Sequence, residues 1–310
     1  MILQIPSPIH QLESDFLAEH RVQLFLKRDD LIHPEVSGNK WRKLELNITK
    51  AQEFDLPILT FGGAYSNHIA ATAAACHHRG IACIGMIRGE EHDGLNPTLS
   101  LASKLGMQLH FISREEYGYK AEEAYIRQLK DNLGAFHLVP EGGANFLGVM
   151  GCTSIIKELP KPFDILCVAG GTGTTAAGML LGLKANQRLE LYPALKGGEF
   201  LQKSIAQLLE YSLFEEMAVN ETLENLIIVS DYHFGGYAKI NAELVDFTQH
   251  FFNEYSVPLD LIYTSKMMFG LFDRISKGLY NKGTSIIAVH TGGLQGNEGF
   301  KSRKGITLNF

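Results

Sequence analysis

Residues 165–178 read Ile-Leu-Cys-Val-Ala-Gly-Gly-Thr-Gly-Thr-Thr-Ala-Ala-Gly, and this stretch decides the fold. Its first five residues form an unbroken apolar run, which is typical of a strand covered on both faces in a parallel sheet. A glycine-rich turn follows, and small residues then begin a helical pattern. A strand, a turn and a helix in this order are the repeating unit of α/β proteins.

The same alternation extends in both directions along the chain. It predicts an α/β fold with mostly parallel sheets covered by helices. The helical patterns cover 67–79, 96–105, 114–133, 148–159, 174–186, 199–211, 238–254 and 265–281. The predicted strands are Pro57–Phe61, Ile81–Ile87, Gln108–Ile112, Phe136–Val139, Ile165–Ala169, Glu190–Pro193, Leu226–Ser230, Leu261–Tyr263 and Ser285–His290.

Length and composition restrict the class of protein. A chain of 310 residues is too long for one small core and suits two lobes. A net charge of −6 and the absence of a basic stripe disfavour nucleic-acid binding. No apolar run approaches the length of a membrane span, and the N-terminal residues lack the pattern of a signal peptide.

The chain has four cysteines, Cys76, Cys83, Cys152 and Cys167. They form no Cys-x-x-Cys pair and are too few for a disulfide framework, so we expect a reducing, cytoplasmic location. Cys76 is followed by His77 and His78, which suggests a metal site. Adjacent residues on a helix point in different directions, however, so we expect no metal there.

The glycine-rich turn has the composition of a phosphate-binding loop. Gly171, Thr172, Gly173, Thr174 and Thr175 offer backbone N–H groups and hydroxyl donors at the carboxyl end of a strand, where ligands bind in open parallel sheets. No Gly-Lys-Ser/Thr follows, and Ala176 stands where a dinucleotide fingerprint needs its third glycine. A phosphate monoester therefore fits better than a dinucleotide, although a plain glycine turn is the alternative.

Two further turns follow predicted strands. The first, residues 62–68, reads Gly-Gly-Ala-Tyr-Ser-Asn-His, and Ser66 or Asn67 can cap the next helix. The N-terminus of that helix favours an anion such as a substrate carboxylate. The second, residues 290–293, reads His-Thr-Gly-Gly and either borders the same cleft or is a structural turn.

Lys40 follows a Ser-Gly-Asn turn and opens a helical pattern, downstream of the charged run Lys27-Arg28-Asp29-Asp30, which we expect to be exposed. A lysine held in such a place can form a Schiff base with a carbonyl cofactor. The chain has 28 lysines and arginines, so a surface role is the default for any one of them. The phosphate loop and the carboxylate turn change that balance, because the three features together indicate a pyridoxal-phosphate enzyme.

The chain resembles the family of D-cysteine desulfhydrases and 1-aminocyclopropane-1-carboxylate (ACC) deaminases, pyridoxal-phosphate enzymes of the tryptophan-synthase-β fold type (fold type II). The resemblance runs from Leu24-Phe-Leu-Lys-Arg-Asp-Asp to His290-Thr-Gly-Gly. Its motifs are Ser-Gly-Asn-Lys-x-Arg-Lys-Leu at 37–44 and Gly-Gly-x-x-Ser-Asn-His at 62–68. It implies a homodimer. We expect a smaller α/β domain at 44–155, a larger one from 1–43 and 156–310, and the cofactor between them.

The resemblance also implies roles for single residues at the cofactor. Lys40 would hold pyridoxal 5'-phosphate as a Schiff base and transfer the substrate proton. Lys43 would help to neutralise the phosphate, which Gly171 to Thr175 would bind. Asn67 would donate to the phenolate oxygen of the pyridine ring, and Thr264 would face the ring nitrogen.

On the substrate side, Ser66 and its neighbours would hold the carboxylate, and Tyr263 would act as a second acid/base group or a stacking wall. ACC deaminases are expected to carry glutamate where this chain has Thr264. Because a hydroxyl does not keep the ring nitrogen protonated as a carboxylate does, threonine favours β-elimination over opening of a cyclopropane ring. His68 agrees, since deaminases tend to have glutamine at that place.

One departure concerns the substrate contact. The family usually has tyrosine in a Tyr-Gly-x-Pro segment, and the matching segment here is His233-Phe234-Gly235-Gly236-Tyr237. Phe234 lacks the hydroxyl, so Tyr237 or His233 supplies the contact, or the substrate differs. The leading expectation is β-elimination of D-cysteine to pyruvate, sulfide and ammonia. The alternatives are ACC deamination, dehydration or racemisation of a D-amino acid, and a non-catalytic cofactor-binding protein.

Overall fold

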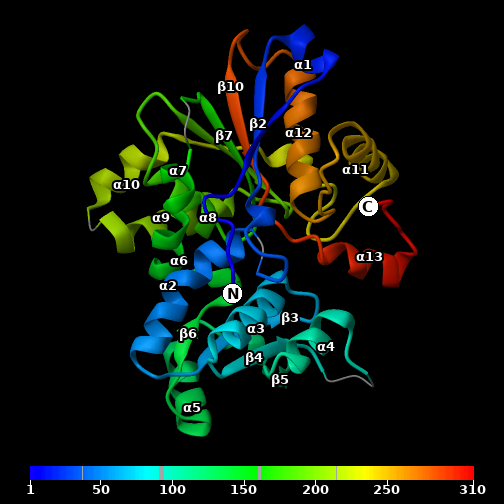
Figure 1. Cartoon of the computed structure of the whole chain (residues 1–310). Coiled ribbons are helices and arrows are strands. Elements are labelled where there is room, and N and C mark those ends of the chain that lie inside the picture. The colour runs from blue at the N-terminus through cyan, green and yellow to red at the C-terminus, as the bar shows by residue number, and fades with distance from the viewer. Residues whose placement is uncertain (37, 91–93, 160–161, 214) are drawn as a thin grey trace.

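The computed structural model describes residues 1–36, 38–90, 94–159, 162–213 and 215–310. They form two sheets, a six-stranded one in the order β1-β2-β10-β7-β8-β9 and a four-stranded one in the order β5-β4-β3-β6. The six-stranded sheet occupies the upper half of Figure 1 and the four-stranded sheet the lower half. The prediction of an α/β fold with mostly parallel sheets is confirmed.

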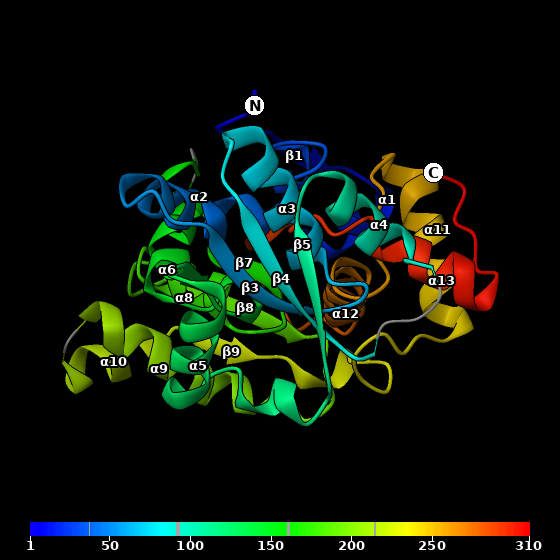
Figure 2. The same ribbon diagram turned by 90° about the horizontal axis from the view of Figure 1, so that it is seen from below.

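The six-stranded sheet consists of β1 (Ile9–Leu12), β2 (Gln23–Lys27), β10 (Ser285–Val289), β7 (Ile165–Gly170), β8 (Arg188–Pro193) and β9 (Leu226–Ile228). Its pairs are parallel apart from β1 with β2. The four-stranded sheet is parallel throughout and consists of β5 (Gln108–Ile112), β4 (Cys83–Arg88), β3 (Ile58–Gly63) and β6 (His137–Val139). Figure 2 shows β3, β4 and β5 side by side.

Helices cover both sheets and connect their strands. They are α1 (Asp15–His20), α2 (Asn39–Glu53), α3 (Asn67–Arg79), α4 (Pro97–Lys104), α5 (Glu123–Leu133), α6 (Phe146–Cys152), α7 (Ser154–Lys157), α8 (Thr174–Leu180), α9 (Phe200–Leu213), α10 (Glu216–Leu223), α11 (Ala242–Tyr255), α12 (Thr264–Ser276) and α13 (Gly296–Lys304). Short 3₁₀ turns lie at Asp29–Leu31, Glu116–Tyr119, Glu141–Gly143 and Ser230–Tyr232. None of the described helices is long and apolar enough to cross a membrane.

One predicted strand is wrong. Residues 261–263 form a turn, because the Asp260 carboxylate accepts the backbone N–H groups of Ile262, Tyr263 and Thr264 at 3.0, 2.8 and 2.9 Å. These bonds turn the chain into α12 and leave no extended backbone for a sheet. The sequence patterns also missed β1 and β2.

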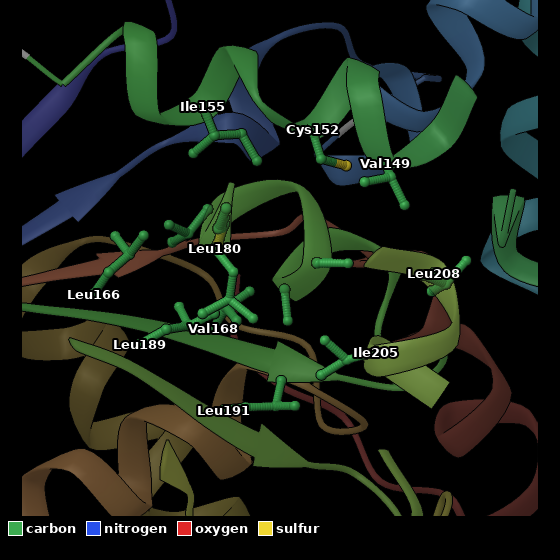
Figure 3. Close-up of a cluster of buried hydrophobic side chains, with 14 of the residues drawn as sticks. Val149, Cys152, Ile155, Leu166, Val168, Leu180, Leu189, Leu191, Ile205 and Leu208 are labelled. Carbon is green, nitrogen blue, oxygen red and sulfur yellow. The ribbon is translucent and has the colours of Figure 1, made fainter. Parts of the chain in front are cut away.

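A buried apolar core joins α6, α8 and the middle of the six-stranded sheet (Figure 3). Val149 and Cys152 of α6 lie above Leu180 of α8, which packs toward Val168 and Leu191 of the sheet. All five side chains are at most 2% exposed, and full burial of an aliphatic side chain of this size contributes about 1.5–3 kcal/mol. This core fixes the sheet from which the glycine-rich turn projects.

Two glycines let α2, α6 and α8 approach until their backbones meet. A Cβ atom on Gly151 of α6 would lie 1.9 Å from the Arg42 carbonyl oxygen of α2. A Cβ atom on Gly178 of α8 would lie 2.4 Å from the Val149 carbonyl oxygen of α6. Because no other residue fits at such distances, these glycines determine how closely α2 lies against the other two helices.

The charged run at 27–30 is buried, which corrects the expectation that it is exposed. It lies at the end of β2, an interior strand between β1 and β10, so the fold covers it. Lys27 Nζ pairs with Glu158 at 2.7 Å, and Arg42 of α2 pairs with Asp29 at 3.0 Å and also with Glu158. Buried charges persist when they are paired in this way.

The predicted domain boundaries stay a prediction. Strands β3 to β6 lie between residues 58 and 139, and the strands of the other sheet lie outside this range. Helix α2 begins at Asn39 and therefore crosses the boundary predicted at residue 44.

Candidate active site

The carboxyl ends of β3, β4, β7 and β10 border one cavity of about 990 Å³. Ligands of open parallel sheets bind at such ends. Many of the predicted site residues line this cavity, although they come from distant parts of the chain. These are Lys40, Lys43, Ser66, Asn67, His68, Gly171, Thr172, Gly173, Thr175 and Tyr263.

Lys40 lies in the first turn of α2, with its amine at the cavity. Its Nζ donates to Asn39 Oδ1 at 3.0 Å, and Asn39 Nδ2 donates to Thr175 Oγ1 at 2.8 Å, so α2 is tied to the start of α8. Burial and then the charge of Lys43 lower the pKa of Lys40 to about 7. The positive end of the α2 dipole acts in the same direction. A substantial fraction of this amine is therefore neutral and nucleophilic near neutral pH.

Lys43 lies one turn later on the same face of α2. It is buried, and burial lowers its pKa. The turn at Glu141–Gly143 lies against it, since a Cβ atom on Gly143 would be 3.0 Å from Lys43 Cβ. Two amines without a carboxylate ion pair among the described residues make this wall of the cavity suited to an anion such as a phosphate.

The glycine-rich turn lines the same cavity as these amines. Gly173 has a φ of 81°, which glycine adopts without strain, and the Thr172 and Thr174 hydroxyls lie 3.0 Å apart. Thr172 and Thr175 line the cavity, whereas Thr174 is buried and does not. The turn therefore presents backbone and two of the three predicted threonine hydroxyls to a ligand.

The turn after β3 presents polar groups from a third side. Ser66 caps α3, and its Oγ accepts the N–H groups of His68 and Ile69 at 3.2 and 3.3 Å. The hydroxyl hydrogen of Ser66 remains available to donate into the cavity. Asn67 follows, and its buried Oδ1 has no hydrogen-bond partner among the described residues.

His68 is a neutral acceptor at the cavity wall. The single hydroxyl hydrogen of Thr60 is donated to the Val139 carbonyl at 2.7 Å, so we assign the proton of the 2.8 Å contact between Thr60 and His68 to His68 Nε2. Nδ1 is then an acceptor without a donor in hydrogen-bonding geometry among the described residues. Burial, followed by the charges of Lys40 and Lys43, holds the pKa of His68 well below its usual range, although the Pro140 backbone lies near enough to the ring to raise this pKa slightly.

Residues 2–292 match one family of proteins, described as pyridoxal-phosphate dependent enzymes. The chain belongs to this family. Its cofactor is pyridoxal 5'-phosphate.

Relatives of this pyridoxal-phosphate enzyme match along most of its length. The chain is 30% identical to the mitochondrial bifunctional D-cysteine desulfhydrase/1-aminocyclopropane-1-carboxylate deaminase of Arabidopsis thaliana, over 95% of this chain and 78% of that protein. It is 27% identical to the D-cysteine desulfhydrase of Salmonella typhi, over 94% of this chain and 93% of that protein. A solved structure of an ACC deaminase homologue superposes with a TM-score of 0.80, at 27% identity over 98% of this chain and 94% of that one.

The cavity of this pyridoxal-phosphate enzyme fits its cofactor. The amine of Lys40 has the lowered pKa that a Schiff-base lysine needs, and Lys43 stands near the glycine-rich turn as a phosphate partner requires. The Asn67 Nδ2 group donates to the Gly293 carbonyl at 3.5 Å, and its Oδ1 has no partner among the described residues, so the side chain offers a further polar contact, with a donor facing that way if the amide is turned over. Ser37, which opens the lysine motif, lies outside the described residues.

Tyr263 and Thr264 lie at different depths. A Cβ atom on Gly171 would lie 3.3 Å from the Tyr263 hydroxyl, so the glycine leaves room for that ring at the cavity. Burial raises the pKa of Tyr263 well above its usual range, which keeps the phenol neutral. Thr264 is buried and is not a lining residue. Its hydroxyl donates to Asp260 Oδ2 at 2.7 Å.

Phe234 is not among the lining residues of the cavity. Its ring packs edge-on against Phe269 of α12, with centroids 5.0 Å apart. Tyr237 lines the cavity instead, with its ring centroid 6.2 Å from that of Tyr263. His233 uses Nδ1 to accept the N–H of Gly235 at 2.9 Å. Of the two substitutes that the sequence suggested for the missing tyrosine, Tyr237 is the one at the cavity.

Sequence reasoning missed several lining residues that follow the strands of the smaller sheet. They include Arg88, Asn96, Arg114 and Glu141. The position of Arg88, Arg114 and Glu141 just after predicted strands was the available signal, because that edge of a parallel sheet faces the ligand, whereas Asn96 caps α4 further along the chain. Asp260 was also missed, because the apolar residues that follow it resemble a strand and hide the turn that its carboxylate caps.

The histidines near Cys76 do not form a convincing metal site. Cys76 is buried, whereas His77 and His78 are exposed on α3. His33, Glu35 and His78 offer ligand atoms within 4.8 Å of one another. His33 Nδ1, however, accepts the N–H groups of Glu35 and Val36, each at 3.2 Å, and a metal on Nε2 would need a proton on Nδ1. Hydrogen bonding explains this cluster better than a metal does.

Proposed function

We propose that this enzyme releases ammonia from a small amino acid by β-elimination, with D-cysteine as the leading substrate and pyruvate and sulfide as the other products. The observation that carries the proposal is the amine of Lys40, whose pKa is lowered to about 7. It lines the same cavity as Lys43 and the 171–175 turn, which offer donors to a phosphate. D-cysteine desulfhydrase activity is named for both the Arabidopsis thaliana and the Salmonella typhi relatives, which supports D-cysteine as the leading substrate.

In this proposal, Lys40 holds the cofactor and Lys43 and the 171–175 turn hold its phosphate. Asn67 contacts the ring oxygen, and Thr264 faces the ring nitrogen, as the resemblance implies. Bound pyridoxal 5'-phosphate supplies an electron-withdrawing ring that stabilises the charge left on the α-carbon when its proton is removed.

The remaining steps belong to side chains of the chain. The lowered pKa of Lys40 lets its amine act as the base that takes the α-proton near neutral pH. The Ser66 hydroxyl and the N-terminus of α3 bind the substrate carboxylate. Tyr263, a neutral phenol, stands at the cavity as a proton donor or a wall.

ACC deamination is the second candidate, and one observation favours it. The Thr264 hydroxyl donates to the carboxylate of Asp260, so an acidic group stands one hydrogen bond behind the position expected to face the ring nitrogen. With its hydrogen used in this way, the Thr264 oxygen can only accept, and it already accepts the Asp260 N–H at 2.8 Å. Its second lone pair would accept a hydrogen bond from a protonated ring nitrogen and so favour that form. The contrast with a glutamate at this position is therefore smaller than the sequence alone indicates.

A substrate panel tests the proposal. Ammonia release is measured for the cofactor-loaded protein with D- and L-amino acids and with ACC. We expect sulfide and pyruvate from D-cysteine, whereas 2-oxobutyrate from ACC would establish the second candidate. Pyruvate from D-serine would indicate a dehydratase, and exchange of enantiomers without ammonia would indicate a racemase. If the loaded protein shows its visible cofactor band but turns over nothing, the enzyme is a cofactor-binding protein and the proposal fails.

We also propose a cytoplasmic homodimer. The four cysteines are free and buried, which suits a reducing compartment. The homodimer rests on the resemblance, and light scattering of the purified protein tests it, with the mass of one chain as the contradicting result.

A further inference from the structure

Lys266, in the first turn of α12, is a buried lysine to which the proposed function gives no task. Its Nζ donates to the carbonyl oxygens of His233 at 2.9 Å, Gly236 at 2.8 Å and Ala194 at 3.3 Å. An ammonium has three hydrogens, and here three carbonyls receive them.

The partners of Lys266 set it apart from the buried cations that form ion pairs. None of the carboxylates in the described residues forms an ion pair with it, whereas Lys27 pairs with Glu158. Burial lowers the pKa of Lys266 to about 8, and the charge of Asp260 opposes this shift. Its ammonium therefore contacts the backbone of one loop and the residue that follows β8. In this position Lys266 holds the loop backbone in place.

The loop it holds, residues 233–238, has an unfavourable backbone. Phe234 and Ala238 have φ values of 53° and 54°, in the left-handed region that residues with side chains rarely adopt. Gly235 and Gly236 between them also have positive φ values, 90° and 120°. Such a conformation persists when surrounding contacts fix it, and two of the three Lys266 bonds end on this loop.

The loop brings Tyr237 to the cavity. The Tyr237 ring stands at 68° to that of Tyr263, which directly precedes α12. The start of α12 therefore supplies one tyrosine of the pair directly and holds the other through Lys266. Phe234 points to the other side of the loop and packs on Phe269 of the same helix.

We propose that Lys266 is a positioning residue, whose ammonium holds the 233–238 loop so that Tyr237 stands beside Tyr263 and limits which substrates enter. The part about substrates rests on the proposed function, and the tether itself does not.

Amide hydrogen exchange of the cofactor-loaded protein, without substrate, tests the tether. In Lys266→Met, which removes the charge and keeps the length, we expect peptides covering 233–239 to exchange about tenfold faster or more. Lys277→Met is the matched control, because Lys277 is an exposed residue at the C-terminal end of α12 that pairs with Asp273, and loop exchange should stay unchanged there. Equal exchange in Lys266→Met and wild type would overturn the proposal.

Lys266→Gln keeps two donors and takes the place of Lys266→Met if the latter does not fold. A smaller acceleration of the same peptides is expected, and no acceleration would again contradict the tether. Peptides of β7 and β8 report whether any effect is confined to the loop.

Kinetics test the consequence for substrates. We expect Lys266→Met and Tyr237→Ala each to raise KM about tenfold while kcat changes less, and the double variant to be no worse than the single ones. Additive losses would show that Lys266 does not act through Tyr237. If no amino acid is turned over at all, the proposed function fails, and the exchange measurement still decides the tether.

Discussion

Helix α2 carries three cations within four residues, and they face two different environments. Arg42 pairs with Asp29, which follows β2, and with Glu158, which follows α7, and the hydrogen bonds and charges of these carboxylates outweigh burial and raise its pKa. Lys40 and Lys43 point into the cavity, where burial lowers their pKa values. Arg42 and Lys43 are both at most 4% exposed, so burial alone does not decide the outcome. A carboxylate partner makes one cation structural, and the lack of such a partner leaves the other two available for chemistry.

The largest effect is expected where the unpartnered amine is removed. Lys40→Ala should lower turnover about a thousandfold or more and abolish the visible cofactor band, because no other amine has the same place. Steady-state kinetics and an absorption spectrum measure both. Lys50→Ala, an exposed position on the same helix, is the control and should behave as wild type. Turnover that survives in Lys40→Ala would show that Lys40 is not the reactive group.

Removal of the partnered cation should affect stability rather than chemistry. Arg42→Met leaves Asp29 and Glu158 with Lys27 alone, and breaking a buried ion pair costs about 3–5 kcal/mol. Denaturant unfolding of the cofactor-free protein measures this. Lys50→Met, which breaks an exposed pair with Glu53, should cost less than about 0.5 kcal/mol. A similar small loss in Arg42→Met would mean that the ion cluster contributes little.

The pH dependence of stability separates the two environments further. The pKa of Lys40 is about 7 in the folded protein against 10.5 for an ordinary lysine. Between these values the unfolded chain holds a proton that the folded chain has lost, so raising the pH through this window stabilises the cofactor-free protein. The slope is at most about 1.4 kcal/mol per pH unit for one proton. Lys40→Met should reduce the slope measured between pH 7 and the alkaline end of the window, and an unchanged slope would contradict the lowered pKa.

The smallest effect is expected at Phe234, a neutral side chain that is packed away from the cavity. Phe234 faces Phe269 rather than the cavity, so Phe234→Tyr should change the ratio of kcat/KM between two substrates less than about twofold. Tyr237→Phe, which alters a lining residue, should change that ratio more. A large effect of Phe234→Tyr would place residue 234 at the substrate after all.

The sequence locates residues of the cavity well where a signal is local. Gly171 to Gly173 and the Ser66 cap lie within a few residues of the strands and helices they join, so their place at the cavity can be predicted from spacing, and their roles stay predictions. The charged run at 27–30 could not be placed, because its partner Glu158 is more than a hundred residues away. A run of charges looks solvated until the fold brings its counterions together.

The errors at 261–263 and at Phe234 have a related cause. The apolar residues after Asp260 resemble a strand, and only the carboxylate that accepts three backbone N–H groups makes them a turn. Phe234 aligns with the family tyrosine, but the left-handed backbone of its loop and the ring of Phe269 direct it elsewhere. An alignment of two sequences therefore does not determine which side chain of a strained loop faces a ligand.

The close contact of α2, α6 and α8 has a consequence for how this protein tolerates change. In a library of all single substitutions selected for activity, Gly151 and Gly178 should be depleted as strongly as Lys40. A single methyl group at Gly151 would collide with the Arg42 carbonyl and displace the helix that carries the amine. Depletion of substitutions at Gly151 and Gly178 would reflect the close contact of the helix backbones. The positions that tolerate no substitution would therefore include structural glycines as well as the residues that perform the reaction.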